Sequence, residues 1–594
     1  MPRLTPYQAD FSAGELSPKL WGRIDLDQYY SGASELLNFT VLPYGPITRR
    51  AGTRFVTSAP ESAAIRLIPF IYSVNQSVVI ELTDKKARFF YKGGLILNGD
   101  APYEIVTTWT ADMLADLRFA QSGDIMYFVC GSQKPIKLSR YGWTDWRFEE
   151  ITFVSQPADW EENNWPRQVC FFDQRLVLAS TPKQPQTIWC SRVGIFNDFT
   201  METQVTVGST TETEVLDTDA IEYTISSDDA NEICWLQPLE ILAVGTAGAE
   251  YKVASSALNE ALTPNNFRIT KQTNYGSAYI SSKSLGTGTV FVQRASSRIR
   301  LYDYQYLENQ WAATNITVFA DHIAVSGAKD IAVQTSKDMY LWVVMGDGTL
   351  ACFTYEKQQK VNAWHRHVIA GAKVLSLTVI PGDDSDQVWL AVERTIGGEK
   401  AVYIEVMDHP FPEATAPEDA VFLDSHLLYD GDKTSELSGL SHLEGETVSV
   451  LVDGWVHPDV EVKNGTIELQ KPGSKICAGL KFVSRFVSLE VQAQQNITKG
   501  LNKRLVEAEV ALYKSLGLRS GIIPGEVTDF ENRTTDTVYF GPTRHMDAAQ
   551  QLFTGVYKIS LTGSTTYDQR LVLENSLPLP TTICGIKYVM EVNG

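Results

Sequence analysis

The sequence predicts an all-β protein built around a degenerate β-propeller of six or seven blades. Its 594 residues include 25 Tyr, 25 Phe and 13 Trp, and aromatic residues of this abundance favour strands. From about residue 65 a unit of strand, short turn and strand recurs, with starts about 45 to 65 residues apart. A period of roughly 50 residues with several strands per repeat is typical of propeller blades. A set of stacked β-sandwiches stays open as the alternative.

Seven segments carry the repeat, and each joins two apolar runs through a short polar turn. Turns such as GDG (346–348) supply the glycines that tight hairpins need. No segment ends in Trp-Asp, which argues against a WD40 array. The segments begin at Ser77 (SVVIELTDKKARFFY), Ile125 (IMYFVCGSQKPIKLSRY), Val169 (VCFFDQRLVLAS), Ile233 (ICWLQPLEILAVGT), Thr289 (TVFVQRASSRIRLYDY), Met339 (MYLWVVMGDGTLACFTY) and Val388 (VWLAVERTIGGEKAVYIEVM).

We expect four parts along the chain. An irregular, contact-rich N-terminal assembly arm (1–64) precedes the propeller body (65–406), and deletion of residues 1–55 is expected to leave a folded propeller. A Pro- and Asp-rich linker (407–440) leads to a C-terminal β module (441–594) with hairpin turns at DGW and KNGT. Within that module, LNKRLVEAEVALYKSLG (501–517) fits a strand as well as a helix.

The charge balance restricts the partners. The net charge is −20, and such an acidic surface disfavours a sequence-reading DNA binder or a membrane-surface protein. Residues 201–260 hold twelve acidic residues and one lysine, and their first part, near 201–231, is expected to leave the blade as an exposed excursion. We expect no membrane segment, because the longest apolar run is too short to span a bilayer. The seven scattered cysteines fit reduced core thiols.

Catalytic motifs are not recognisable in the sequence, so we expect no enzyme activity, no cofactor and no metal. His365 and His367 share one face of a strand and could supply two metal ligands, but no third ligand is identifiable. We interpret them as part of an exposed polar face. Asp383, Asp384 and Asp386 could bind calcium or act as acid and base, although a solvated turn is the favoured interpretation.

The segment RRAGTR (49–54) places Arg49, Arg50 and Arg54 within six residues. Phosphate binding is one interpretation. Pairing with acidic surfaces of neighbouring chains is the preferred one, because the region 1–60 is nearly balanced in charge. Together with Phe11 and Arg23, these arginines are our candidate assembly contacts.

The opening stretch carries a series of motifs in a fixed order: F-S-x-G-E-L-S-P (Phe11–Pro18), G-R-x-D (Gly22–Asp25), Y-x-x-G-A (Tyr30–Ala33), L-x-N-F (Leu37–Phe39) and R-R-x-G-T-R-F (Arg49–Phe55). This series resembles the N-terminus of the tail nozzle proteins of short-tailed bacteriophages, also called tail tubular protein B. The likeness continues through 171–179, 188–199, 219–238, 242–253, 275–281, 291–304 and 442–455, and so covers most of the chain.

The resemblance implies a hexameric tube with propeller bodies at the distal end of a virion tail, assembled in the host cytoplasm. It implies attachment to a tail adaptor ring and docking of fibres or spikes near that attachment. It also implies retention of packaged DNA and its passage during ejection. No catalytic residues are implied. An acidic lumen would let phosphates slide, and Glu212, Glu214, Asp217 and Asp219 are our candidate lumen residues. The alternatives are a receptor-binding or polysaccharide-degrading tail enzyme on a propeller fold and a monomeric protein-binding propeller.

Overall fold

The computed structural model describes the whole chain except residues 1–2, 61–63, 208–209, 228, 257–259, 412–415, 494–497, 525–550, 562–564 and 594. In this described part strands dominate, and the one α-helix is the four-residue α1 (Asp27–Tyr30). Short 3-10 turns lie at Pro18–Leu20, Ala111–Met113, Pro417–Asp419 and Ser441–Leu443.

Seven antiparallel blades of four strands each follow one another in the described chain, and all their strands lie within residues 66–407 except the outermost strand of the seventh blade. The first has β8 (Arg66–Ser73), β9 (Gln76–Thr83), β10 (Lys86–Tyr91) and an outer edge made of β11 (Gly94–Leu95) and β14 (Glu104–Val106). The second blade has β15 (Arg118–Ser122), β16 (Ile125–Val129), β17 (Ile136–Gly142) and β18 (Asp145–Glu150). The third blade has β19 (Gln168–Phe172), β20 (Arg175–Ala179), β21 (Thr187–Cys190) and β24 (Ile221–Thr224). The fourth blade has β25 (Ile233–Pro238), β26 (Leu242–Thr246), β27 (Glu250–Ser255) and β28 (Phe267–Thr273). The fifth blade has β29 (Lys283–Leu285), β30 (Gly288–Val292), β31 (Ile299–Gln305) and β32 (Gln310–Asn315). The sixth blade has β33 (Ala328–Gln334), β34 (Tyr340–Met345), β35 (Leu350–Glu356) and β36 (Val361–His367). The seventh blade has β37 (Ala372–Ile380), β38 (Gln387–Ile396), β39 (Glu399–Met407) and β7 (Thr53–Ser58).

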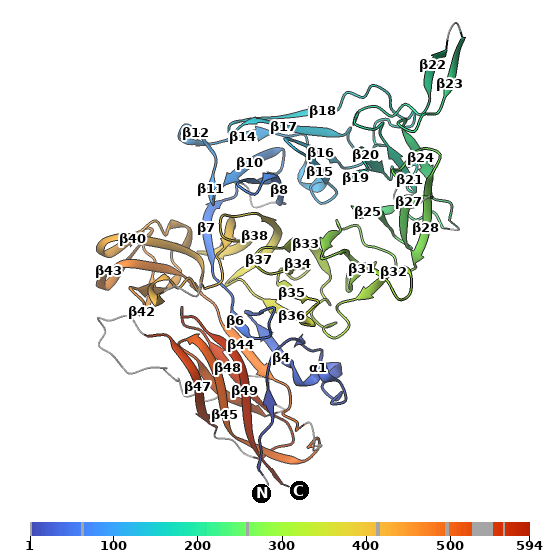
Figure 1. The fold of residues 1–594 in the computed structure, drawn as a ribbon. Coiled ribbons are helices and arrows are strands. Elements are labelled where there is room, and N and C mark those ends of the chain that lie inside the picture. Colours follow the sequence, from blue (N-terminus) through green and yellow to red (C-terminus); the bar gives the residue numbers. More distant parts are fainter. Residues whose placement is uncertain are drawn as a thin grey trace.

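The seven sheets form a closed ring, seen face-on in Figure 1. Each neighbouring pair of blades buries a shared apolar cluster. The cluster that closes the ring joins Val79 and Phe90 of the first blade to Trp389 and Ile404 of the seventh. Radial packing therefore buries the face that each small sheet would otherwise expose. The prediction of an all-β degenerate propeller is confirmed, and among the described residues the blade number is seven.

The outer strand of the seventh blade comes from the N-terminal region. Strand β7 pairs antiparallel with β39, with Arg54 opposite Val406. The opening stretch is irregular only between its short strands, and it lies against its own chain rather than standing free as an arm. Deletion of residues 1–55 would remove half of β7 together with earlier paired strands, so the structure argues against a folded propeller in the truncated chain.

Two blades continue beyond the ring into the C-terminal half. Beyond β36 the sixth blade adds β3 (Gly14–Glu15), β4 (Gly32–Leu37), β44 (Ser484–Ser488), β48 (Gln569–Asn575) and β46 (Arg519–Pro524). Beyond β7 the seventh blade adds β40 (Leu423–Ser438), β43 (Thr466–Lys481), β41 (Thr447–Val452) and β42 (Trp455–Glu461). Most of the second half of the expected linker (407–440) is thus the long strand β40.

A third sheet completes the C-terminal module. It contains β47 (Phe553–Ser560), β45 (Asn502–Ser515), β49 (Thr582–Asn593), β6 (Ile47–Arg49) and β5 (Phe39–Val41), with β1 (Arg3–Leu4) and β2 (Tyr7–Gln8) paired to β49. The ambiguous segment 501–517 is therefore mostly a strand. The largest buried cluster lies between this sheet and the outer strands of the sixth blade's sheet, so N-terminal and C-terminal residues share one sandwich core.

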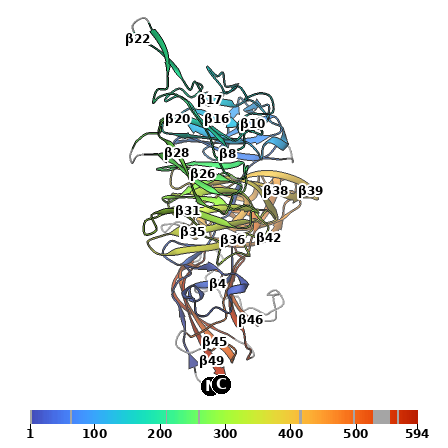
Figure 2. The same cartoon turned by 90° about the vertical axis from the view of Figure 1, so that its right-hand side faces the viewer.

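The molecule is elongated, with the propeller at one end and both termini at the other (Figures 1 and 2). A hairpin of β22 (Thr203–Val207) and β23 (Thr210–Glu214) leaves the third blade at the end opposite to the termini.

Candidate functional site

The motif residues of the opening stretch gather at the joint between the propeller and the C-terminal sandwich. Gly14 has a φ of +67°, and an added Cβ there would lie 2.5 Å from the Trp364 carbonyl oxygen. Glu15, which is 1% exposed, binds Arg366 at 2.9 Å and His322 at 2.6 Å. Burial opposes ionisation of Glu15, but His322 and Arg366 hold its pKa below the usual value. The G-E pair of the motif thus docks the opening stretch on the sixth blade.

Arg49 anchors the end of β6 in the sandwich. Its guanidinium donates to the carbonyl oxygens of Phe482 at 2.9 Å and Leu579 at 3.0 Å, and to Ser484 Oγ at 3.0 Å. It also lies over the Phe482 ring, 4.6 Å from the centroid. Burial lowers the pKa of Arg49 to about 9. Its donors are therefore used by carbonyl and hydroxyl oxygens of its own chain.

Arg50 forms a two-pronged ion pair with Asp424 at the start of β40. The two N–O distances are 2.8 and 2.7 Å, and both side chains are almost fully buried. Arg50 also donates to Asn38 Oδ1 and to the Val368 carbonyl oxygen. Burial opposes ionisation of Asp424, but the Arg50 charge and hydrogen bonds lower its pKa. Arg50 therefore connects the opening stretch to the residue that follows β36 of the sixth blade and to β40.

A second buried network lies on the other side of Gly52, where an added Cβ would be 1.9 Å from the Leu423 carbonyl oxygen. Thr53 Oγ1 donates to Glu405 at 2.6 Å and accepts the Ser425 backbone N–H at 3.0 Å. Glu405 in turn pairs with Arg394 at 2.9 Å, and both are fully buried. Buried charges are tolerated only when they are paired in this way, so the motif R-R-x-G-T fixes one geometry of the joint.

The candidate assembly contacts therefore need correction. Phe11, Arg49 and Arg50 are 0–2% exposed, and Phe11 packs edge-on against Phe486 at 5.2 Å. They contact their own chain and not an acidic surface of a neighbour. Arg54 is half-buried and donates to the Gly93 carbonyl oxygen at 3.2 Å. Arg23 is exposed and pairs with Asp25, so it keeps the most solvent access of the five candidates.

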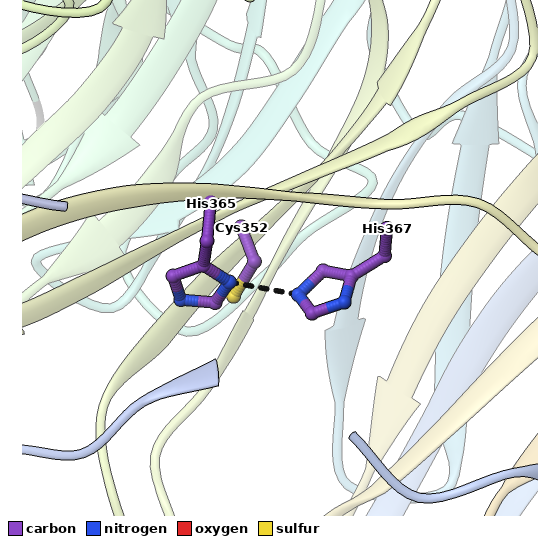
Figure 3. Close-up of side chains that lie close together, drawn as sticks. All are labelled: Cys352, His365 and His367. Carbon is purple, nitrogen blue, oxygen red and sulfur yellow. Dashed lines mark hydrogen bonds between the residues drawn. The ribbon is translucent and has the colours of Figure 1, made fainter. Parts of the chain in front are cut away.

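The histidine pair was expected on an exposed face, and this expectation is wrong, because His365 and His367 are both fully buried. They lie on β36, and Cys352 on β35 is the cross-strand partner of His365. Figure 3 shows the two rings joined by a hydrogen bond of 2.7 Å, with the Cys352 sulfur beside His365. Cys352 is the third residue that sequence reasoning missed.

The hydrogen bonds of this cluster form one chain of donors. Thr354 Oγ1 donates to the Val41 carbonyl oxygen at 2.8 Å, so it accepts from His365 Nε2 at 3.0 Å. His365 Nδ1 is then free to accept the Nε2 proton of His367. Burial lowers the pKa of His365 to about 3, and burial together with His365 and Arg50 lowers that of His367 well below its usual value. Both rings are therefore neutral at pH 7.

The same cluster could supply metal ligands. One atom each of Cys352, His365 and His367 lies within 4.8 Å of the others, and these are donor types that bind zinc. A bound ion would have to displace the hydrogen bond between the rings, and Arg50 places a positive charge beside His367. Burial also raises the pKa of the Cys352 thiol. The arrangement favours a hydrogen-bonded structural cluster over a metal centre.

The four candidate lumen residues separate into two kinds. Glu212 and Glu214 lie exposed on the projecting hairpin, and Asp217 is exposed just after it. Asp219 is fully buried, where it accepts from Thr203 Oγ1 at 2.6 Å and lies 3.3 Å from Arg192. Asp219 therefore holds the base of the hairpin and cannot line a lumen.

The acidic turn 381–386 lies between β37 and β38. Asp383 and Asp384 are exposed, whereas Asp386 accepts the backbone N–H groups of Thr335 at 2.7 Å and Ser336 at 3.0 Å. One of the three carboxylates is thus committed to the neighbouring blade, which leaves no triad for calcium.

Comparison with known proteins adds little to this picture. No family model matches the chain, and no curated protein matches it. Among solved structures, the chain is similar to one described as the crystal structure of RRP9 WD40 repeats, at 10% identity and a TM-score of 0.36, over 61% of this chain and 100% of that one. The seven-bladed ring follows from the strand order and not from this weak similarity. In the part of the chain that the structure describes, no helix is long and apolar enough to cross a membrane.

Proposed function

We propose that the chain is a structural subunit of the tail nozzle of a short-tailed bacteriophage, the distal tube that retains packaged DNA and conducts it during ejection. The ordered motif series from Phe11 to Phe55, with its continuation along the chain, carries this proposal. In the proposal six copies surround the tail axis, an adaptor ring holds them, and fibres or spikes dock near that attachment.

The position of the motif residues supports an architectural role. Gly14, Glu15, Arg49, Arg50 and Gly52 all serve the joint between the propeller and the sandwich. Two sheets run without interruption from the ring into the C-terminal half. A wall that resists the pressure of packaged DNA needs such rigidity, whereas a catalytic pocket does not need it.

The acidic balance also supports passage of DNA without adhesion. A net charge of −20 repels phosphates, and the exposed carboxylates of the projecting hairpin add to this wherever a duplex comes near. Repulsion reaches only about 8 Å at physiological ionic strength, so only groups close to the DNA contribute.

Immunogold labelling of virions tests the proposal. Antibodies raised against the purified chain should label the distal end of the tail, and mass spectrometry should find the chain in the virion. Label that is confined to fibres or spikes would favour the receptor-binding or polysaccharide-degrading alternative, and absence of the chain from virions would refute both. As a matched control, antibodies against the capsid protein should leave the tail unlabelled.

A further inference from the structure

Two neighbouring half-open cavities, of about 600 and 330 Å³, lie along the axis of the propeller. The inner strands of all seven blades contribute to their walls, and the two cavities share Arg118 and Ser281. A volume of this size is ample for a small ligand.

Three cations converge on this axis from three different blades: Arg66 on β8, Arg118 on β15 and Lys283 on β29. We call them the axial cation cluster. Burial, together with the Arg118 charge, lowers the pKa of Arg66 to about 10. Burial also lowers the pKa of Lys283, with Asp330, Arg66 and Arg118 as the neighbouring charges. The three cations are therefore close enough to repel one another.

No cation of the cluster forms an ion pair with a carboxylate among the described residues, although Asp330 and Asp116 are near enough to raise the pKa of Arg66. Asp330 and Glu393 are the two carboxylates in the cavity walls, and Glu393 is paired with Lys400 at 3.0 Å. Asp330 accepts from the Ile331 backbone N–H and from Ser376, and no cation forms an ion pair with it in this part of the chain. A fourth base, Lys329, also lines the larger cavity.

Hydrogen-bond donors are left over at the same place. Arg66 and Arg118 give several of their N–H groups to carbonyl oxygens, including that of Leu117, but Arg118 Nε is buried and has no acceptor among the described residues. The Lys283 ammonium has no hydrogen-bond acceptor in the described chain, and it lies 5.7 Å from the centroid of the Phe119 ring. Unpaired buried donors and like charges are both costly, and one multivalent oxyanion would relieve both.

We propose that the axial cavity binds a phosphate group at the axial cation cluster. A phosphate group carries close to two negative charges at pH 7 and several strong acceptor oxygens, which match the three cations and the unused donors. The source of the group is either free inorganic phosphate or a small phosphate monoester. Inorganic phosphate and adenosine monophosphate serve as separate probes for these sources.

Isothermal titration of the full chain in chloride buffer of fixed ionic strength tests the proposal. We expect one saturable phosphate site per chain. Lys283→Met should weaken it at least about tenfold, as expected for loss of a charged hydrogen bond. Lys271→Met removes the same charge from the exposed outer strand β28, and should leave the affinity unchanged. A higher affinity for adenosine monophosphate than for inorganic phosphate would identify a phosphate monoester as the ligand.

Labelling of the unmodified protein decides the matter if Lys283→Met fails to fold. With an amine acylating reagent at pH 8, saturating phosphate should slow modification of Lys283 and leave that of Lys271 unchanged. The proposal is overturned by absence of saturable binding up to about 10 mM phosphate, by equal affinity of Lys283→Met, or by a Lys283 labelling rate that phosphate does not change.

Discussion

Removal of the Arg50 side chain is the sharpest perturbation of the joint. In Arg50→Met the Asp424 carboxylate, which is fully buried, would lose both of its charged hydrogen bonds. Loss of one partner of a buried ion pair costs about 3–5 kcal/mol, because the other charge stays buried and uncompensated. Since 1.36 kcal/mol is a factor of ten, amides that open with the joint should exchange about 150 to 5,000 times faster.

Hydrogen exchange with mass spectrometry measures this directly on peptides that contain β7 and the start of β40. Arg147→Met is the matched control, because Arg147 forms an exposed ion pair with Asp145. The exchange pattern of this variant should match that of the unmodified protein. The double variant Arg50→Met/Asp424→Asn should recover part of the loss. Acceleration below about tenfold, or no recovery in the double variant, would refute the assignment of a charge-dependent joint.

The pH dependence of the same pair has a definite sign. The folded-state pKa of Asp424 lies below its ordinary value near 3.9. Its contribution to stability is therefore complete above about pH 5 and is lost as the pH falls through the folded-state pKa. Urea midpoints of the unmodified protein should fall more steeply below about pH 4 than those of Arg50→Met.

Four further outcomes are expected. A chain that lacks residues 1–55 should be insoluble or proteolysed, because the seventh blade and the sandwich lose strands; a soluble product with native circular dichroism would contradict the fold. As the pH falls from 6.5 to about 3, buried neutral His365 should reduce the free energy of unfolding by up to about 1.4 kcal/mol per pH unit, because the unfolded chain binds the proton first, and His367 should act in the same direction; an equal slope in His365→Gln/His367→Gln would contradict this. EDTA should leave the urea midpoint unchanged, and stoichiometric zinc by elemental analysis would contradict the hydrogen-bonded cluster. Replacement of Glu212, Glu214 and Asp217 with lysine should slow DNA ejection, most strongly at low salt. Unchanged ejection kinetics across a salt series would show that the hairpin takes no part in DNA transit.

Local pattern carried the prediction of the blades, because each blade is a run of sequential hairpins whose turns are visible in the chain. It could not reveal that β7 completes the seventh blade, since its partner β39 lies about 350 residues away and pairing leaves no local trace. The linker was misjudged for a similar reason: Asp and Gly in 424–432 suggest a loop, but backbone pairing with β43 makes a strand.

The site residues show the same limit. Arg49 and Arg50 were expected at the surface because arginine is rarely buried unless paired, and the partner Asp424 is distant in sequence. Cys352 could have been found: if KQQK (357–360) is taken as the hairpin turn, the register places Cys352 opposite His365. Burial of that face was the missing information, because both sides of a propeller blade pack against neighbours.

A cryo-electron microscopy reconstruction of the virion tail tests the central proposal most directly. The account predicts six copies around the axis at the distal end of the tail, each with a seven-bladed ring and its attached sandwich, and an open axial channel wide enough for duplex DNA. Distal tube density that does not accommodate this fold, or density for the chain only in fibres or spikes, would contradict it.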